Sequence, residues 1–404
     1  MTEKILNSLT RLKKYCESEG FKGYDPYDGL NSSLFHSFHF LSNRRLARLA
    51  WIQLFKWLPF NIRQLVGISK DYNPKALGLF LSGYCNLYKI NPTQDTLDYI
   101  NFLSSKLIEL ANTNYSGLCW GYNFDWQAKA FFQPKNTPTV VATTFIADAL
   151  LSAYEITYNE QLLKIARSSC DFIMKDLNQT YDSKENFAFS YSPLDNTVVF
   201  NASLLGSRLL SRVQYFTHEK ELIDAAKKSV AFCCGYQQND GSWSYGTLHF
   251  HKWIDNFHTG YNLECISDYM KYSEDHSYED ILQKGFEYYV STFFTENGIS
   301  KYYNNSMFPI DIHAPAQLVI TLSKLGLFME YTKLTDRVLD WTITNMQSER
   351  GYFYFQKKKY FTSQIPYMRW SQAWMFYALS EYLRQKEDHK NLNSGFSMYA
   401  RNIN

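Results

Sequence analysis

Two histidines, His258 and His313, carry the clearest chemical signal in this sequence. Each follows an aspartate, in DNFHTG and in DIHAPA, at the start of an expected helix. A neutral imidazole beside a carboxylate is a natural proton acceptor. Asp255, His258, Asp311 and His313 are therefore our candidates for acid–base catalysis.

Removal of a proton next to a sugar carboxylate, as in lyases and epimerases, also needs a cation that neutralises the carboxylate. Arg369 in MRWSQAW is the candidate, because a guanidinium fork matches a carboxylate or a phosphate. The alternative is structural: Arg369 pairs with Asp311 or another loop acid. The sequence leaves both open.

Glycoside hydrolysis is a further alternative and requires two carboxyl groups on opposite sides of the scissile bond. Four loop aspartates could supply such a pair: Asp125, Asp195, Asp255 and Asp311. An aspartate just before a helix also commonly caps that helix. Hydrolase, lyase and epimerase chemistry therefore remain alternatives.

The chain is rich in aromatic residues, with 32 Tyr, 30 Phe and 9 Trp. Most of them are expected in the core, whereas those in loops are candidates for stacking on sugar rings. The candidate substrate-binding residues are Trp120, Tyr122, Trp126, Tyr191, Asp195, Trp243, Tyr245, Trp253, Asn256, Tyr302, Tyr367, Trp370 and Gln372. Trp374 lies one turn into its helix, so we expect it in the core.

The loops that carry these residues recur along the chain. Residues 236–264 predict a helix end, a turn at NDG, a short aromatic strand and a new helix, and similar units occupy 181–201, 295–314 and 348–372. A longer unit occupies 117–141. Each unit ends at a helix N-terminus, so the five loops are expected to build one pocket.

The helices between these loops alternate in character. Apolar helices with small residues are expected to begin near residues 73, 141, 198, 259, 314 and 369, and amphipathic helices near 2, 94, 160, 219, 278 and 331. Helices that are apolar all round are buried, and helices that are apolar on one side cover others. This pattern predicts an all-α fold, an (α/α)6 toroid over residues 1–388 with short β-hairpin-like loops on the pocket face. Residues 389–404 are expected to form a polar tail.

Composition excludes several classes of protein. The net charge of +2 argues against a general nucleic-acid binder, and the 7 cysteines lack the spacing of a disulfide framework or a zinc site. We expect no metal and no cofactor. The N-terminal segment has no apolar signal region, and no run of about 18 apolar residues occurs, so a cytoplasmic protein is expected. The oligomeric state is not indicated.

One segment has an unusual charge pattern. Residues 29–70 contain no Asp or Glu, and basic residues alternate there with large apolar ones. Such a helix can lie on an anionic membrane. Peripheral contact with the inner membrane is therefore predicted through Arg44, Arg45, Arg48, Trp51, Lys56 and Trp57. The alternative is an ordinary packed helix.

Several long motifs resemble a known family. They are NPKALGLFLSGYCNLY, LCWGYNFDWQAKAFF, NTPTVV, FSYSPLDN, QQNDGSWSYG, WIDNFHTGYNLE, FPIDIHAPAQ and IPYMRWSQAWMFYAL. Together they resemble the VpsJ-like polysaccharide biosynthesis proteins over most of the chain and, more broadly, the six-hairpin glycosidases. The resemblance implies a toroid acting on an exopolysaccharide or capsule glycan, with uronic acids as one option.

Two rival functions remain. Gln237, Gly241 and Trp243 match the Q-x-x-x-G-x-W motif of terpene cyclases and related prenyltransferases, but the motif occurs clearly once and no DxDD or DDxxD motif accompanies it. The other rival is a non-catalytic, glycan-binding or scaffold subunit of a polysaccharide assembly complex.

Overall fold

A closed ring of inner helices forms the centre of the molecule. The computed structural model describes residues 1–128 and 132–401. Within that part of the chain the inner helices are α5 (Pro74–Ile90), α7 (Val140–Thr157), α9 (Phe200–Thr217), α11 (Asn256–Ser273), α13 (His313–Lys324) and α15 (Trp374–Arg401). Each packs on the next, and α15 packs back on α5, so the ring closes and the predicted (α/α)6 toroid is confirmed.

A second layer of helices covers the ring. It consists of α6 (Gln94–Glu109), α8 (Glu160–Lys175), α10 (Lys220–Cys234), α12 (Glu279–Phe293), α14 (Thr332–Met346) and, packed on α15, the N-terminal helix α1 (Thr2–Ser18). The outer helices bury one face each, whereas α7 is buried over most of its length. By length and composition α7 could cross a membrane, but 72% of it is buried, as expected for a core helix.

The loops at one end of the ring contain short antiparallel strands. β1 (Trp126–Gln127) pairs with β2 (Phe132–Gln133), and β3 (Gln179–Tyr181) pairs with β4 (Phe187–Phe189). A three-stranded sheet joins two successive loops through β5 (Ile310–Asp311), β6 (Gln356–Lys357) and β7 (Thr362–Ser363). Two further short helical segments are η3 (His249–His251) and η4 (Met368–Ala373), which leads into α15.

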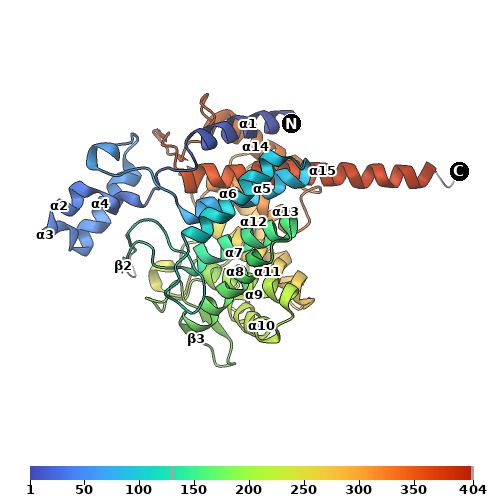
Figure 1. Cartoon of the computed structure of the whole chain (residues 1–404), viewed down its shortest axis with the longest axis horizontal. Coiled ribbons are helices and arrows are strands. Elements are labelled where there is room, and N and C mark those ends of the chain that lie inside the picture. Colours follow the sequence, from blue (N-terminus) through green and yellow to red (C-terminus); the bar gives the residue numbers. More distant parts are fainter. Residues whose placement is uncertain (129–131, 402–404) are drawn as a thin grey trace.

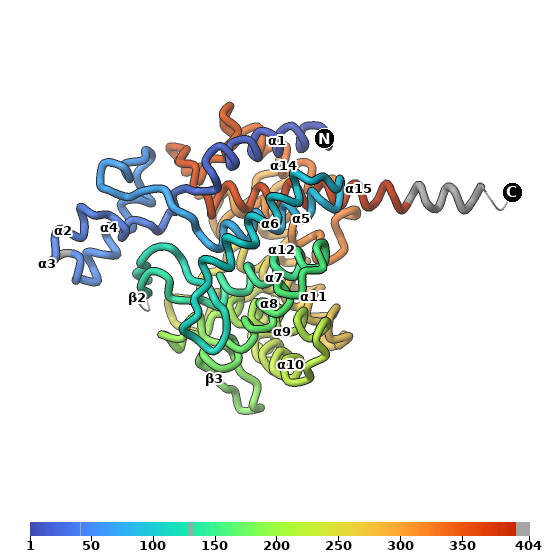
Figure 2. The backbone as a smooth tube through the Cα atoms, viewed as in Figure 1, coloured from blue at the N-terminus to red at the C-terminus, as the bar shows by residue number. Residues whose placement is uncertain are grey.

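An insertion separates α1 from α5. It contains η1 (Asp28–Asn31), α2 (Ser33–Ser37), α3 (His39–Ser42), α4 (Arg45–Trp57) and η2 (Gln64–Val66), and it has a small core of Leu30, Phe35 and Ile52. Figures 1 and 2 show that it projects from the ring on the side where the loops lie. Residues 389–401 continue α15 as helix, and the last three residues of the expected tail lie outside the described residues.

The Q-x-x-x-G-x-W motif joins successive outer helices. Gln237 Nε2 donates to the carbonyls of Gly241 (3.1 Å) and Ile281 (2.8 Å), and Trp243 Nε1 donates to the Cys233 carbonyl (3.1 Å). Gln347 makes the matching bonds, to the carbonyls of Gly351 and of Ser8 on α1. The motif is therefore structural, and a variant of it with Phe353 in place of tryptophan makes the same kind of joint between α14 and α1.

A buried ion network links four inner helices away from the loops. Arg212 lies 2.6 Å from Asp148, Arg208 lies 3.6 Å from Glu264, and Lys324 lies 3.1 Å from Asp268. Burial opposes ionisation of Asp148, but Arg212 and Arg208 hold its pKa well below the usual value. Each ion pair joins two different inner helices, so the network helps to fix how neighbouring helices pack against each other.

Candidate functional site

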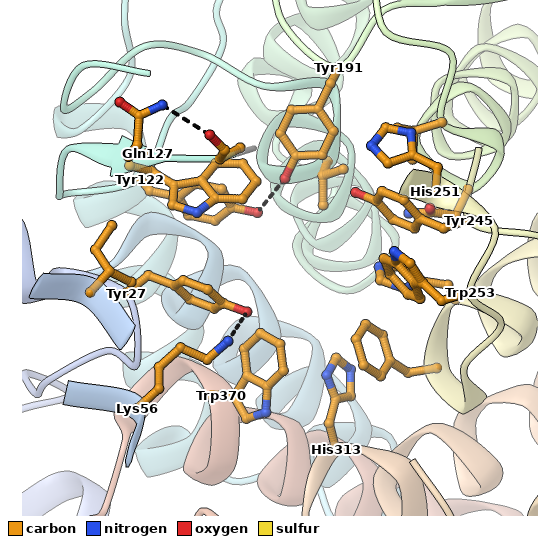
Figure 3. Close-up of a pocket in the computed structure, with 18 of the residues that line it drawn as sticks. Tyr27, Lys56, Tyr122, Gln127, Tyr191, Tyr245, His251, Trp253, His313 and Trp370 are labelled. Carbon is orange, nitrogen blue, oxygen red and sulfur yellow. Dashed lines mark hydrogen bonds between the residues drawn. The ribbon is translucent and has the colours of Figure 1, made fainter. Parts of the chain in front are cut away.

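A cavity of about 430 Å³ opens where the inner helices begin. Its walls are mainly aromatic: Tyr27, Tyr122, Trp126, Tyr191, Tyr245, Trp253, Phe257, Tyr302, Tyr303 and Trp370. Figure 3 shows ten labelled lining residues around one central space, with Tyr27, Lys56 and Trp370 facing Tyr245, His251 and Trp253. Flat faces with hydroxyl edges suit the alternating apolar and polar surfaces of a sugar.

The first turns of five inner helices, and of η4 before the sixth, place side chains in this cavity. Asn73, Thr139 and Asp255 cap α5, α7 and α11 by accepting bonds from the backbone, which fixes where each helix begins. The second residues of α5, α7, α9, α11 and η4 then line the cavity; they are Lys75, Val141, Asn201, Phe257 and Arg369. Position within the repeat therefore decides which residues reach the site.

His258 is the most accessible of the predicted catalytic residues in the cavity. Its Nδ1 lies 2.8 Å from Asp255 Oδ2, while Asp255 Oδ1 accepts the His258 backbone N–H at 2.9 Å. A carboxylate on Nδ1 holds the proton there and leaves Nε2 as a lone-pair acceptor. The dyad predicted from sequence is therefore assembled, with Asp255 buried behind the imidazole and outside the cavity lining.

His313 lies on the neighbouring helix and is almost fully buried. Its ring stacks on Phe257 at 4.4 Å, and its Nε2 lies 3.0 Å from Tyr261 Oη. Burial, with the charges of Lys75, His258 and Arg369, lowers its pKa well below the usual value, so the imidazole is neutral. Its Nδ1 has no hydrogen-bond partner among the described residues.

Arg369 is paired with a loop acid, as the structural alternative for this residue had it, and that acid is Asp25 and not Asp311. Asp25 binds its Nε at 2.6 Å and its Nη2 at 2.9 Å. Burial opposes the charge, but Asp25 raises the pKa of Arg369. Neither of these bonds uses Nη1, and Arg369 lines the cavity.

Lys75 is the main site residue that the sequence analysis missed. Its Nζ lies 4.1 Å from the Phe145 ring centroid, 5.5 Å from that of Tyr261 and 5.4 Å from that of Trp374. No acid pairs with it in the described part of the chain. Burial, Arg369 and Arg208 lower its pKa well below the usual value. The cation–π contacts offset part of the free energy that burying the charged amine costs.

The insertion forms one side of the cavity. Leu49, Ile52, Gln53 and Lys56 on α4 line it, and Lys56 Nζ lies 3.5 Å from Tyr27 Oη. Two residues of the predicted membrane segment are engaged in packing: Trp51 Nε1 donates to the Gly29 carbonyl, and Arg48 Nε donates to Gln127. One side of α4 therefore lines the cavity, and Trp51 and Arg48 bind neighbouring loops of the protein.

Most of the predicted site residues reach the cavity. Those that line it are His258, His313, Arg369, Tyr122, Trp126, Tyr191, Tyr245, Trp253, Tyr302 and Trp370. Trp374, expected in the core, is fully buried. Additional lining residues that the sequence analysis did not select include Tyr27, Gln127, Asn201, His251 and Tyr261.

The other predicted acids lie outside the cavity lining because they bind the backbone and neighbouring side chains. Asp311 is fully buried and accepts bonds from Gln356, Trp370 Nε1 and the His313 N–H, and burial raises its pKa to about 6. Asp195 binds Ser192 and Thr197. Asp125 accepts the Lys135 N–H. Asp311 therefore positions Trp370 and the start of α13 instead of contacting substrate.

The remaining predicted binding residues also lie outside the cavity lining. Trp120 is buried and donates to the Leu107 carbonyl, as Trp243 does to Cys233. Asn256 accepts a bond from Tyr289, and Gln372 binds both backbone groups of Phe353. Tyr367 is buried with its ring 4.7 Å from the Arg63 guanidinium. Trp120, Trp243, Asn256 and Gln372 therefore use a polar group within the fold, and Tyr367 packs on Arg63.

The cavity combines acid–base groups with cations and lacks a carboxylate. Within residues 1–128 and 132–401, no Asp or Glu lines it, whereas Lys56, Lys75 and Arg369 do. The lining therefore does not contain the pair of carboxyl groups that glycoside hydrolysis usually requires. Transfer of a proton by imidazole has three candidate residues in the lining, His251, His258 and His313, of which His258 and His313 were predicted from the sequence.

No protein-family model matches this sequence, and no curated protein sequence matches it. Solved structures share its fold. The cellobiose 2-epimerase from Bacillus thermoamylovorans B4167 superposes with a TM-score of 0.63 at 13% identity, covering 80% of this chain and 90% of that one. An unsaturated glucuronyl hydrolase specific for heparin superposes with a TM-score of 0.63 at 12% identity, covering 96% of this chain and 97% of that one.

A family 76 α-mannanase from Bacteroides thetaiotaomicron gives a TM-score of 0.59 at 12% identity, covering 79% of this chain and 87% of that one. These neighbours are carbohydrate-active enzymes with six-hairpin glycosidase-like toroids. Identities this low show the fold alone. The narrower resemblance to VpsJ-like proteins stays a prediction.

Proposed function

We propose that this protein is a carbohydrate-active enzyme that epimerises a sugar by moving a proton on carbon. The observation that carries the proposal is a sugar-sized aromatic cavity lined by the imidazoles of His251, His258 and His313 and by no carboxylate of the described chain. An epimerase is among the structural neighbours. The resemblance to polysaccharide biosynthesis proteins supports an exopolysaccharide or capsule glycan, or its precursor, as substrate.

The proposed reaction begins at His258. Its Nε2 takes the proton from a carbon next to a carbonyl or carboxylate, and the electrons of the C–H bond move onto that group's oxygen. The N–H of the neutral His313, which is bonded to Tyr261, returns a proton to the opposite face of the planar intermediate. His313 then regains a proton from solvent, and His258 releases the proton that it took. The carbon is thereby inverted, and no bond of the glycan chain is broken.

Lys75 and Arg369 supply the positive charge that the intermediate requires. Lys75 lies in the first turn of α5, where the helix dipole disfavours a cation, so its charge costs stability that a bound anion would recover. Arg369 is already stabilised as a cation by Asp25. An anion beside Lys75 would also raise the pKa of its amine again. We therefore propose a substrate with a carboxylate or phosphate, such as a uronate.

The test is proton exchange in deuterium oxide, followed by NMR, with uronate-containing oligosaccharides and a neutral disaccharide as probes. We expect the wild type to place deuterium on one sugar carbon of an anionic probe, and His258→Gln to lose this activity while still binding the probe. His276→Gln is the matched control, because His276 forms a similar pair with Glu279 on the surface, with Nδ1 at 2.9 Å.

Two results would overturn the proposal. One is release of shorter, water-added fragments without exchange, which would indicate a hydrolase. The other is probe binding without exchange in any variant, which would indicate a binding subunit. An unsaturated fragment would retain His258 as the base but change the reaction to elimination.

A further inference from the structure

The outward surface of the insertion exposes large apolar side chains. Phe40, Leu46 and Trp57 are 72%, 80% and 67% exposed. The full set is Leu34, Phe38, Phe40, Leu46, Leu54, Trp57, Phe60 and Leu65, all within one stretch of the chain. Single exposed apolar residues are ordinary, but a cluster of this kind marks a surface that another body covers.

The helix α4 has two apolar faces. Ile52 and Phe55 are buried against the insertion core and the ring. Leu46, Leu54 and Trp57 repeat at helical spacing along the exposed side of the same helix. Packing within the chain accounts for the first face and not for the second.

This surface is also basic. Arg44 is exposed, and no acid occurs in residues 29–70. The loop between β6 and β7 extends it: Lys358 Nζ donates to the Lys56 carbonyl at 2.8 Å and lies 4.7 Å from the Trp57 ring, and Lys359 and Tyr360 are exposed beside it. Two segments far apart in sequence thus form one basic and aromatic surface.

We propose that this surface, formed by α2–α4 and the β6–β7 loop, docks onto an anionic lipid bilayer. Basic side chains would meet lipid phosphates, and Trp57 and the phenylalanines would enter the interface. A second copy of the chain fits less well, because a twofold contact would bring two basic surfaces together. The proposal stands independently of the chemistry assigned to the cavity.

Docking in this way has a consequence for substrate access. The opposite side of α4 lines the cavity through Ile52 and Lys56. The insertion lies at the loop end of the ring, away from the C-terminal end of α15 (Figure 1). The cavity would therefore open next to the bilayer, where a glycan attached to a lipid is held.

The test is flotation of the full chain with vesicles of phosphatidylcholine alone and of phosphatidylcholine with phosphatidylglycerol. We expect binding to the anionic vesicles only, weakened about tenfold or more by Leu46→Ser combined with Trp57→Ser. Arg44→Gln combined with Lys359→Gln should weaken it about fivefold per charge at low salt. Leu6→Ser, an exposed leucine on α1, is the matched control and should bind as the wild type does.

The substituted side chains are exposed, so melting temperatures should match the wild type and exclude unfolding as the cause. Equal binding to both kinds of vesicle, or binding that survives both double substitutions, would overturn the proposal. Absence of vesicle binding together with self-association that Leu46→Ser and Trp57→Ser remove would assign the surface to a second copy instead.

Discussion

Asp255 makes two bonds whose roles one substitution can separate. In Asp255→Asn the amide oxygen can still cap α11, but the amide N–H₂ would face His258 Nδ1 and favour the tautomer with the proton on Nε2. We expect the turnover number to fall about 10³-fold or more, with the free energy of unfolding changed by less than about 1 kcal/mol. Steady-state kinetics and thermal melting measure the two effects.

Glu279→Gln is the control for this substitution, because Glu279 binds a histidine on the surface in the same way. It should leave turnover unchanged. If the folded fraction of Asp255→Asn fell enough to account for the whole loss of turnover, Asp255 would act only as the N-cap of α11.

Lys75 is expected to lower stability at neutral pH. Its pKa is lowered in the folded state, so the unfolded chain binds the proton more readily, and stability rises with pH towards the unfolded pKa of about 10.4. Lys75→Met should therefore melt higher than the wild type at neutral pH, with a difference that shrinks as the pH rises. Proton exchange should fall about 10²-fold.

Lys89→Met, at the exposed end of the same helix, is the control and should show neither effect. A Lys75→Met protein that melts lower at every pH would contradict the account, since the amine would then be a structural group.

The site could be predicted from sequence where chemistry and repeat position agreed. His258, His313 and the loop tyrosines were found because they stand in aromatic loops before helices. Lys75 was missed because it lies in an apolar helix, although it occupies the second helical position, as Arg369 does. The pairing of Arg369 with Asp25 could not be predicted, because the two are brought together only when the ring closes.

At the scale of elements, the turn after an outer helix fits against the next outer helix. Gly351 has a φ of +95°, and a Cβ there would lie 2.4 Å from the Arg11 carbonyl of α1. We expect Gly351→Ala to lower the free energy of unfolding by about 3 kcal/mol or more, from strain and from displacement of α1.

Gly326→Ala separates these two causes. Gly326 has a similar φ of +72°, but nothing lies within 4 Å of the added Cβ. Its cost should be about 1 kcal/mol, from backbone strain alone. Denaturant unfolding of both variants measures the difference, and equal costs would argue against close packing of the turn on α1.

The elements were predictable because burial leaves a regular trace in the sequence. Helices α7 and α9 are buried over most of their length and α8 is buried on one side, as inner and outer helices require. α4 was harder to interpret. One apolar side of it builds the cavity and the other is exposed, so its composition indicated a membrane helix and gave no sign of the wall it forms.

At the scale of the whole molecule, the first helix completes the ring that the last helix closes. α1 packs on α15, and Gln347 binds α1 through the Ser8 carbonyl. The count of six apolar and six amphipathic helices, with the N-terminal helix included, predicted that the ring closes in this way. The sequence did not indicate that the insertion after α1 would return to cover the cavity, because no local pattern encodes contacts between α4 and the ring loops.

The central claim is that the cavity moves a proton and does not add water across a glycosidic bond. One reaction in deuterium oxide that also carries heavy oxygen tests it, with the product analysed by mass spectrometry. The account predicts a sugar that gains one deuterium on carbon, no heavy oxygen and no loss of chain length, and no gain in the His258→Gln protein. Shortened products that carry heavy oxygen would contradict it.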